Sequence, residues 1–211
     1  MKFNHFLTSY IPDLSIGFKT HFENMIEQSI FAEECGYNTV SIPEHHLVNL
    51  LMMPSPLQMA VKIATLTKNI NIATSVAVLP LHDMRTYAGE ISTADILTDG
   101  RLIFGVGRGA FAWEMNRLGS PIETSKEKFI ESLEVLKLLL SKKDVGFKGK
   151  YYNFDPITIM PRPISNPIQF MIAAMDPSSI ENAASQGFHV QSTVLSSSKD
   201  LLIERVNAFK K

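Results

Sequence analysis

The sequence predicts an α/β protein built on a parallel sheet, and three observations support this. Strand-like and helix-like segments alternate along all 211 residues. The strand-like segments are almost wholly apolar, as parallel strands buried on both faces are. Six strand-then-helix units can be counted. This number suits an open doubly wound sheet and is short of the eight units of a (β/α)8 barrel, which takes roughly 250 residues.

The expected strands are short runs rich in β-branched, aromatic and other apolar residues. They are residues 2–10, 37–42, 70–80, 101–107, 168–175 and 188–195. Pro43 ends the second of them. We expect residues 141–168, rich in Gly, Lys and Pro, to form a long loop with a short β excursion at 151–160.

The expected helices show apolar residues at helical spacing together with start and stop signals. They are residues 20–36, 55–67, 83–100, 126–142, 176–187 and 199–211. Thr20 and Glu23 form a capping box for the first, and Gly36 ends it. Ser55 is the expected N-cap of the second, with Pro56 at its first position.

Composition restricts the class of protein. Hydrophobic residues make up 45% and charged residues 19%, which indicates a globular chain with a sizeable core. A net charge of −1 gives no electrostatic reason to expect nucleic acid or a membrane surface as partner. Cys35 is the single cysteine, so a disulfide within the chain and a multi-cysteine metal site are excluded. We expect a cytoplasmic protein, without a secretory signal at the N-terminus.

The segment GRLIFGVGRGA, residues 100–110, is rich in glycine, and Gly105 to Ala110 match the dinucleotide pattern G-x-G-x-x-[GA]. The pattern follows the fourth strand, however, and residues 111–121 allow at most a short helix, so a dinucleotide site is disfavoured. One alternative is a tight turn that needs glycines for backbone room. The other adds Arg108, a guanidinium at a strand end that can bind a single phosphate.

The second strand ends in SIPEHH, which places Glu44, His45 and His46 where α/β folds position chemistry. Adjacent side chains on extended backbone point apart, so Glu44 and His46 would share one side and His45 the other. Such a histidine can act as a general base near neutral pH. The alternatives are plain capping or a metal site; the latter would need His5 or His82 and is disfavoured.

The fifth strand leads into AMDPSS, a helix start with free N–H groups and hydroxyls for an anion. Capping is the favoured role for Asp176, because its charge would repel a phosphate. For Ser178 and Ser179, capping and anion binding stay equally open. The small residues Thr74 and Ser75 in the third strand serve core packing or leave room for a planar ligand.

These segments together resemble the bacterial luciferase-like flavin-dependent monooxygenases. The matching stretches are ECGYNTVSIPEHH, SPLQMAVKIATLT, NINIATSVAVLPLH, GRLIFGVGRGAF and FMIAAMDPSSIENAASQG. The resemblance implies a TIM (β/α)8-type barrel truncated to about six βα units. Residues 1–211 would form a single barrel domain, incomplete at its C-terminus. The chain could then be a fragment, a barrel closed by a partner or a compact relative.

The resemblance also implies a cofactor and a site. FMN would lie at the carboxyl-terminal mouth, with His45 beside the flavin as the catalytic residue. Its phosphate would contact Arg108, in the loop with Gly107, and the Ser178–Ser179 region. The flavin ring would pack on Ser75–Val76, a peptide bond that can be cis in this family.

The implied activity is monooxygenation of a small organic substrate such as an aldehyde, with O2 and reduced FMN from a separate flavin reductase. Because unpaired sheet edges favour association, we expect a homodimer. Departures from the luciferases themselves, at Gly107, Phe111, Met175 and Asp176, disfavour light emission. The alternatives are a non-catalytic flavin-binding protein, or an oxidoreductase that uses a deazaflavin or a nicotinamide.

Overall fold

The structure is a computed structural model that describes residues 1–195 and 197–211. Its strands are β1 (Asn4–Phe6), β2 (Thr39–Ile42), β3 (Asn71–Thr74), β4 (Ala77–Val78), β5 (Leu102–Gly107), β6 (Val145–Lys148), β7 (Asn153–Ile157), β8 (Gln169–Ala173) and β9 (His189–Gln191). Its α-helices are α1 (Phe18–Glu34), α2 (Pro56–Ala64), α3 (Met84–Leu97), α4 (Ala112–Arg117), α5 (Ile122–Ser141), α6 (Pro177–Ser185) and α7 (Lys199–Lys210). Two short 3-10 helices, η1 (Leu14–Ile16) and η2 (Leu79–Leu81), complete the described elements.

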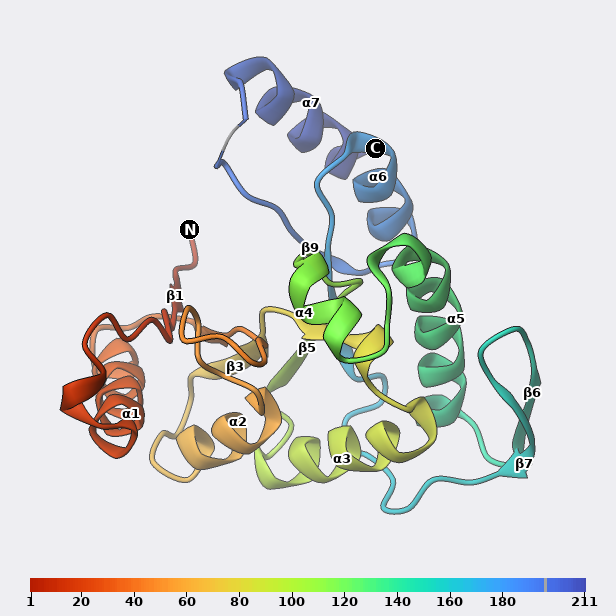
Figure 1. The fold of residues 1–211 in the computed structure, drawn as a ribbon, viewed down its shortest axis with the longest axis horizontal. Coiled ribbons are helices and arrows are strands. Elements are labelled where there is room, and N and C mark those ends of the chain that lie inside the picture. The colour runs from red at the N-terminus through yellow and green to blue at the C-terminus, as the bar shows by residue number, and fades with distance from the viewer. Residues whose placement is uncertain (196) are drawn as a thin grey trace.

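The main sheet is parallel throughout, and its strands follow chain order: β1, β2, β3, β5, β8, β9, with β4 also paired to β5. A doubly wound sheet reverses its strand order at a switch point, and this sheet has no reversal. Right-handed crossovers in one direction place every connecting helix on the same face. Figure 1 shows α1, α2, α3 and α5 in an arc around the strands, so the sheet is a curled half-barrel.

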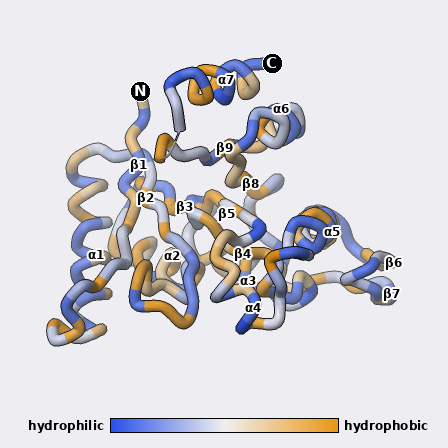
Figure 2. The backbone as a smooth tube through the Cα atoms, turned by 45° about the horizontal axis from the view of Figure 1, so that its top comes forward, coloured by the Kyte–Doolittle hydropathy of each residue, from blue (hydrophilic) through white to orange (hydrophobic). Residues whose placement is uncertain are grey.

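This half-barrel confirms the expected α/β class and the six principal strands in their predicted order. A closed barrel is not formed by the described residues, in which β1 pairs only with β2 and β9 only with β8. Figure 2 shows β1, β2, β3, β5, β8 and β9 side by side in this order across the sheet. One core joins the strands to the helices; Phe104 lies at its centre, with Tyr87 and Phe170 each 5.9 Å away between ring centroids.

The expected third strand, residues 70–80, is broken into β3 and β4. The Ser75–Val76 peptide bond between them is cis, and both pieces pair with β5. At the break the Thr74 hydroxyl donates to the Gly105 carbonyl at 2.7 Å. A Cβ on Gly105 would overlap the Thr74 carbonyl, and one on Gly107 would lie 2.5 Å from Val76 Cγ2. Two glycines of the segment 100–110 therefore give backbone room to this break.

Several local predictions need correction. α1 begins at Phe18 with Gly17 as its N-cap, so Thr20 and Glu23 lie inside the helix and form no capping box. Ser55 is at the N-cap of α2 but makes no side-chain cap bond, and Pro56 is at the first turn as expected. The excursion in the long loop is a complete antiparallel hairpin of β6 and β7.

We predict that Gly105→Ala destabilises the fold by about 2–3 kcal/mol, since the added methyl group overlaps backbone that cannot move aside. Gly89→Ala is the matched control, because its Cβ would meet only the Met160 carbonyl at 3.7 Å inside α3. Replacing a glycine within a helix by alanine raises stability by about 0.5–1 kcal/mol. Urea unfolding should give a lower free energy of unfolding for Gly105→Ala and a higher one for Gly89→Ala. Equal changes in the two variants would contradict the role given to Gly105.

Candidate active site at the carboxyl ends of the strands

The polar residues that follow the strands gather at one edge of the sheet, because parallel strands end on the same side. Glu44 follows β2, Ser75 follows β3, and Arg108 follows β5 directly. Asp176 comes three residues after β8, and Gln191 is the last residue of β9. In Figure 1, α4 lies over the middle of the molecule, within the arc of helices.

Glu44 is the centre of a buried hydrogen-bond network. Its Oε1 accepts from Nε2 of His46 at 2.8 Å and from Nε2 of His82 at 2.7 Å. Its Oε2 accepts from the Val78 backbone N–H at 2.7 Å. Because an ionised carboxylate only accepts, both imidazoles carry a proton on Nε2. The network joins the end of β2 to β4 and to the residue that follows η2.

Glu44 and His46 shift each other's pKa toward the charged form. Burial alone would raise the pKa of Glu44, but the hydrogen bonds from His46 and His82 outweigh it and lower the pKa to about 2. The hydrogen bond to Glu44 raises the pKa of His46. His82 is further held by the Tyr87 ring, stacked at 3.9 Å with an interplanar angle of 3°.

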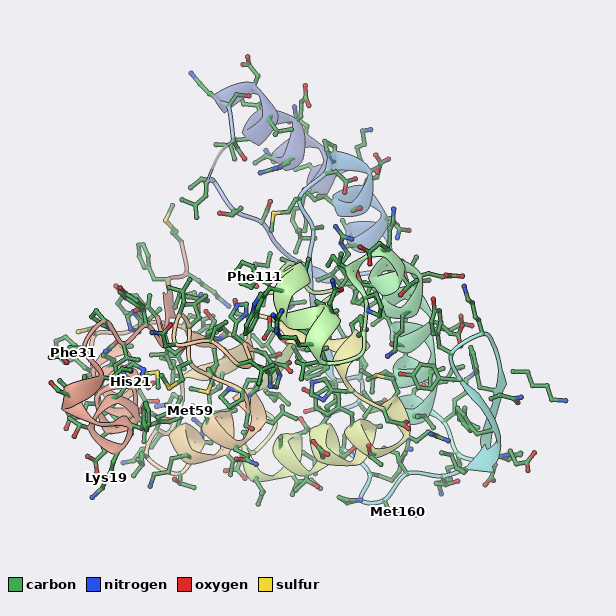
Figure 3. All side chains as sticks on the ribbon, viewed as in Figure 1. Lys19, His21, Phe31, Met59, Phe111 and Met160 are labelled. Atoms are coloured by element: carbon green, nitrogen blue, oxygen red, sulfur yellow. The ribbon has the colours of Figure 1, made fainter. Side chains whose placement is uncertain are left out.

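His45 faces away from this network, as alternation along the chain predicts. Its Nδ1 lies 3.3 Å from Glu114 Oε2, and its ring centroid is 4.9 Å from that of Phe111. The buried Glu114 carboxylate also accepts from the His46 backbone N–H, so it fastens α4 to the end of β2. Figure 3 shows Phe111 near the middle of the molecule, at the start of α4.

Ser75 and Val76 each contact a residue of another strand. The Ser75 hydroxyl donates to Gln191 Oε1 at 2.9 Å, which links the end of β3 to the far edge strand β9. Val76 packs against Gly107, and its side chain takes the room that the missing Cβ leaves. The expected cis bond is present, whereas the expected flavin contacts of Ser75, Val76 and Gly107 stay predictions.

A cavity of about 820 Å³ opens between α5, the end of β8 and α6. It brings Arg108 together with Ser178 and Ser179, as the sequence predicts. Within the described chain the Arg108 guanidinium has no hydrogen-bond or ion-pair partner. His45 is not among the lining residues of this cavity, although His45 and Arg108 both follow strands that end at the same edge of the sheet, and the expectation that one flavin reaches both stays a prediction.

Asp176 occupies the N-cap of α6. Its carboxylate accepts from the Ser178 hydroxyl at 2.6 Å, the Ser179 backbone N–H at 2.9 Å and the Ser179 hydroxyl at 2.7 Å. These bonds, the one from Ser178 first, hold the pKa of Asp176 well below its ordinary value. The predicted capping role of Asp176 is confirmed, and both serine hydroxyls are engaged with it.

The sequence did not single out Glu114, Gln191 or Tyr87. Glu114 and Gln191 lie 69 and 116 residues from His45 and Ser75, and no local pattern marks such contacts, whereas Tyr87 lies close to His82 in sequence. Residues 1–195 and 197–211 contain no group of three or more His, Cys, Asp or Glu suited to a metal ion. None of the helices in these ranges has the length and hydropathy of a membrane span.

Comparison with known protein families and curated proteins gives clear matches. Residues 1–210 match the family described as luciferase-like monooxygenase. The chain is 34% identical over 173 residues to the protein y4vJ of Sinorhizobium fredii, covering 82% of this chain and 49% of that protein. It is 31% identical over 180 residues to the oxygenase component of the flavin-dependent trigonelline monooxygenase of Acinetobacter baylyi, covering 84% and 50%. It is 30% identical over 183 residues to an F420-dependent glucose-6-phosphate dehydrogenase of Amycolatopsis mediterranei, covering 78% and 53%.

Solved structures support the fold. The monooxygenase RslO1 from Streptomyces bottropensis superposes with a TM-score of 0.92 at 24% identity, over 100% of this chain and 65% of that one. The oxygenating constituent of 3,6-diketocamphane monooxygenase from Pseudomonas putida, solved with FMN, gives a TM-score of 0.86 at 18% identity, over 100% and 61%. The chain spans about half the length of the curated relatives it matches.

We predict that Glu44→Gln destabilises the protein by about 2–3 kcal/mol near pH 6, since it removes a charged acceptor of three hydrogen bonds. Because the folded-state pKa of Glu44 is depressed to about 2, its contribution is present above its unfolded value near 4.5 and is lost as pH falls toward 2. Because the pKa of His46 is raised from 6.5, its contribution is full below 6.5 and is lost as pH rises through the raised value.

The stability difference between wild type and Glu44→Gln should therefore be largest between about pH 5 and 6.5 and shrink on either side. Thermal melts from about pH 3 to 9 measure it. Glu90→Gln, on the exposed face of α3, is the control and should show little effect. A stability difference between wild type and Glu44→Gln that does not change with pH would contradict the charge states assigned to Glu44 and His46.

Proposed function

The chain belongs to the luciferase-like monooxygenase family, and on this basis we propose that it forms the flavin-binding part of a flavin-dependent monooxygenase. The reaction would use reduced FMN and O2 on a small organic substrate such as an aldehyde, with the reduced FMN supplied by a separate reductase. Bound FMN would supply the redox and oxygen chemistry, while the protein binds, orients and excludes water.

The unpaired Arg108 guanidinium on the 820 Å³ cavity is the observation that carries this proposal. The cavity volume falls in the range of about 300–1,000 Å³ typical of small-molecule and cofactor sites. A guanidinium at a strand end suits a phosphate because it can donate two parallel hydrogen bonds. The positive charge of Arg108 would attract a flavin phosphate, whereas the negative charge of Asp176 would repel one.

His45 is the proposed catalytic residue. Glu114 is positioned 3.3 Å from its Nδ1, which leaves Nε2 as the nitrogen able to exchange a proton with a substrate. Glu114 would orient this ring, in the way that a carboxylate fixes the tautomer of an active-site histidine. The short helix α4, which carries Glu114, would keep bulk water from the ring.

Two alternatives have support of their own. The similarity to an F420-dependent dehydrogenase favours a deazaflavin as the cofactor, with hydride transfer in place of oxygenation. The other alternative is a protein that binds flavin without turnover, for which the cavity at Arg108 suffices. Unpaired edges at β1 and β9, within the described part of the sheet, support the proposed homodimer.

We predict that the protein binds FMN with a Kd of tens of micromolar or tighter, and that Arg108→Gln weakens binding about 10- to 100-fold, since a charge-assisted hydrogen bond to phosphate is lost. Flavin fluorescence titration measures both. Arg85→Gln is the control, because Arg85 pairs with Asp83 on α3, off the cavity. Absence of binding by oxidised and reduced FMN would count against the proposed function.

We predict that His45→Asn lowers the rate of substrate-dependent oxygen consumption about 100-fold or more, as expected when an acid–base group is removed. FMN affinity should change less than about 3-fold, since His45 does not line the Arg108 cavity. His189→Asn, an exposed histidine on β9, is the control. Flavin binding without oxygen consumption in the wild type would favour the non-catalytic alternative, and reduction of F420 would favour the deazaflavin alternative.

A further inference from the structure

Asp176 and Arg108 extend from neighbouring strands at the same edge of the sheet. β5 and β8 are parallel, with Val106 opposite Ile172, so Arg108 and Asp176 both lie just past the paired strand ends. Both line the 820 Å³ cavity. No ion pair joins them in the described structure, because the carboxylate turns to α6 while the guanidinium stays unpaired.

The donors at the start of α6 are already used. The N-terminus of a helix offers N–H groups and a positive dipole end to an anion. Here both Asp176 oxygens accept from the two serines that follow, through two hydroxyls and one backbone N–H. An internal carboxylate thus holds the position where an external anion would otherwise be stabilised.

Within the described residues, two cations of the lining have no hydrogen-bond or ion-pair partner: Arg108, and Lys126 near the start of α5. Lys137 lies further along α5, where its Nζ is 3.3 Å from Gln186 Oε1 and 4.8 Å from the Phe188 ring centroid. Glu134 adds a second negative charge to the lining. A phosphate dianion would therefore be attracted by Arg108 and repelled by Asp176 across the same space.

We propose that the Asp176 carboxylate takes the place of a ligand phosphate at the N-terminus of α6, so that the flavin phosphate is bound by the cations Arg108 and Lys126 and not by the helix N-terminus. This inference rests on the proposed function and makes Asp176 a specificity-determining residue. The chain then discriminates weakly between flavins with a terminal phosphate dianion and flavins without one. The serines at 178 and 179 contribute through Asp176 and do not contact the phosphate.

The first test compares FMN with riboflavin, which lacks the phosphate, in fluorescence titrations. Wild type should prefer FMN by less than about 10-fold, because the charge of Asp176 offsets most of the attraction of Arg108 and Lys126. Asp176→Asn removes the charge and keeps a good N-cap, so the variant should fold. It should tighten FMN at least about 10-fold and leave riboflavin within about 2-fold.

Asp200→Asn is the matched control, because Asp200 is an exposed aspartate in the first turn of α7 and does not line the cavity. It should leave both affinities unchanged. A wild-type preference for FMN above about 100-fold, or an Asp176→Asn variant with unchanged or weaker FMN affinity, would overturn the inference.

A second test needs no flavin and so separates this inference from the proposed function. Inorganic phosphate should raise the melting temperature of Asp176→Asn by several degrees and leave wild type within about 1 °C, because the variant loses the repelling charge and its single amide oxygen no longer accepts from both serine hydroxyls. The double variant Asp176→Asn with Arg108→Gln should lose most of this response. Equal responses of wild type and Asp176→Asn would overturn the inference even if flavin binds.

Discussion

The candidate site depends on one buried carboxylate. Glu44 accepts hydrogen bonds from His46, from His82 and from the backbone of β4, so it joins the end of β2 to a segment that lies 34 to 38 residues further along the chain. A buried charge is tolerated only when it is paired and hydrogen-bonded, and here all three donors converge on it. These hydrogen bonds fix the position of β4 relative to the end of β2. They therefore also fix this edge of the half-barrel.

The sequence predicted the principal strands and their order because hydrophobic runs and helix periodicity are local signals. The strand pattern continues unbroken through residues 70–80, and only the family resemblance placed a cis peptide bond at Ser75–Val76, because the cause of the break lies in β5, where Gly105 accommodates the Thr74 carbonyl. The sequence also missed β6, the first strand of the hairpin, since Val145–Lys148 is short and carries lysine and glycine. Start signals misled at Thr20, where Gly17 supplies the N-cap instead.

The candidate site was predicted in part. Arg108 with Ser178 and Ser179 meet in one cavity, because β5 and β8 are neighbours and their ends carry these residues. His45 contacts Glu114, which lies 69 positions further along the chain. No sequence pattern predicts such a contact. Gly105 and Gly107 give backbone room to the fold, and this packing accounts for two glycines of the dinucleotide pattern without a cofactor. Asp176, predicted as a cap, also changes the electrostatics of the cavity.

A crystal structure of the protein with FMN tests the central claim most directly, namely that the edge held by Glu44 is a flavin site whose phosphate end is Arg108. The account predicts phosphate oxygens within hydrogen-bond distance of the Arg108 guanidinium, with the Asp176 carboxylate still on its two serines and the Glu44 clamp unchanged. A phosphate bound to the Ser178 and Ser179 hydroxyls with Asp176 displaced, or a flavin bound away from Arg108, would contradict it.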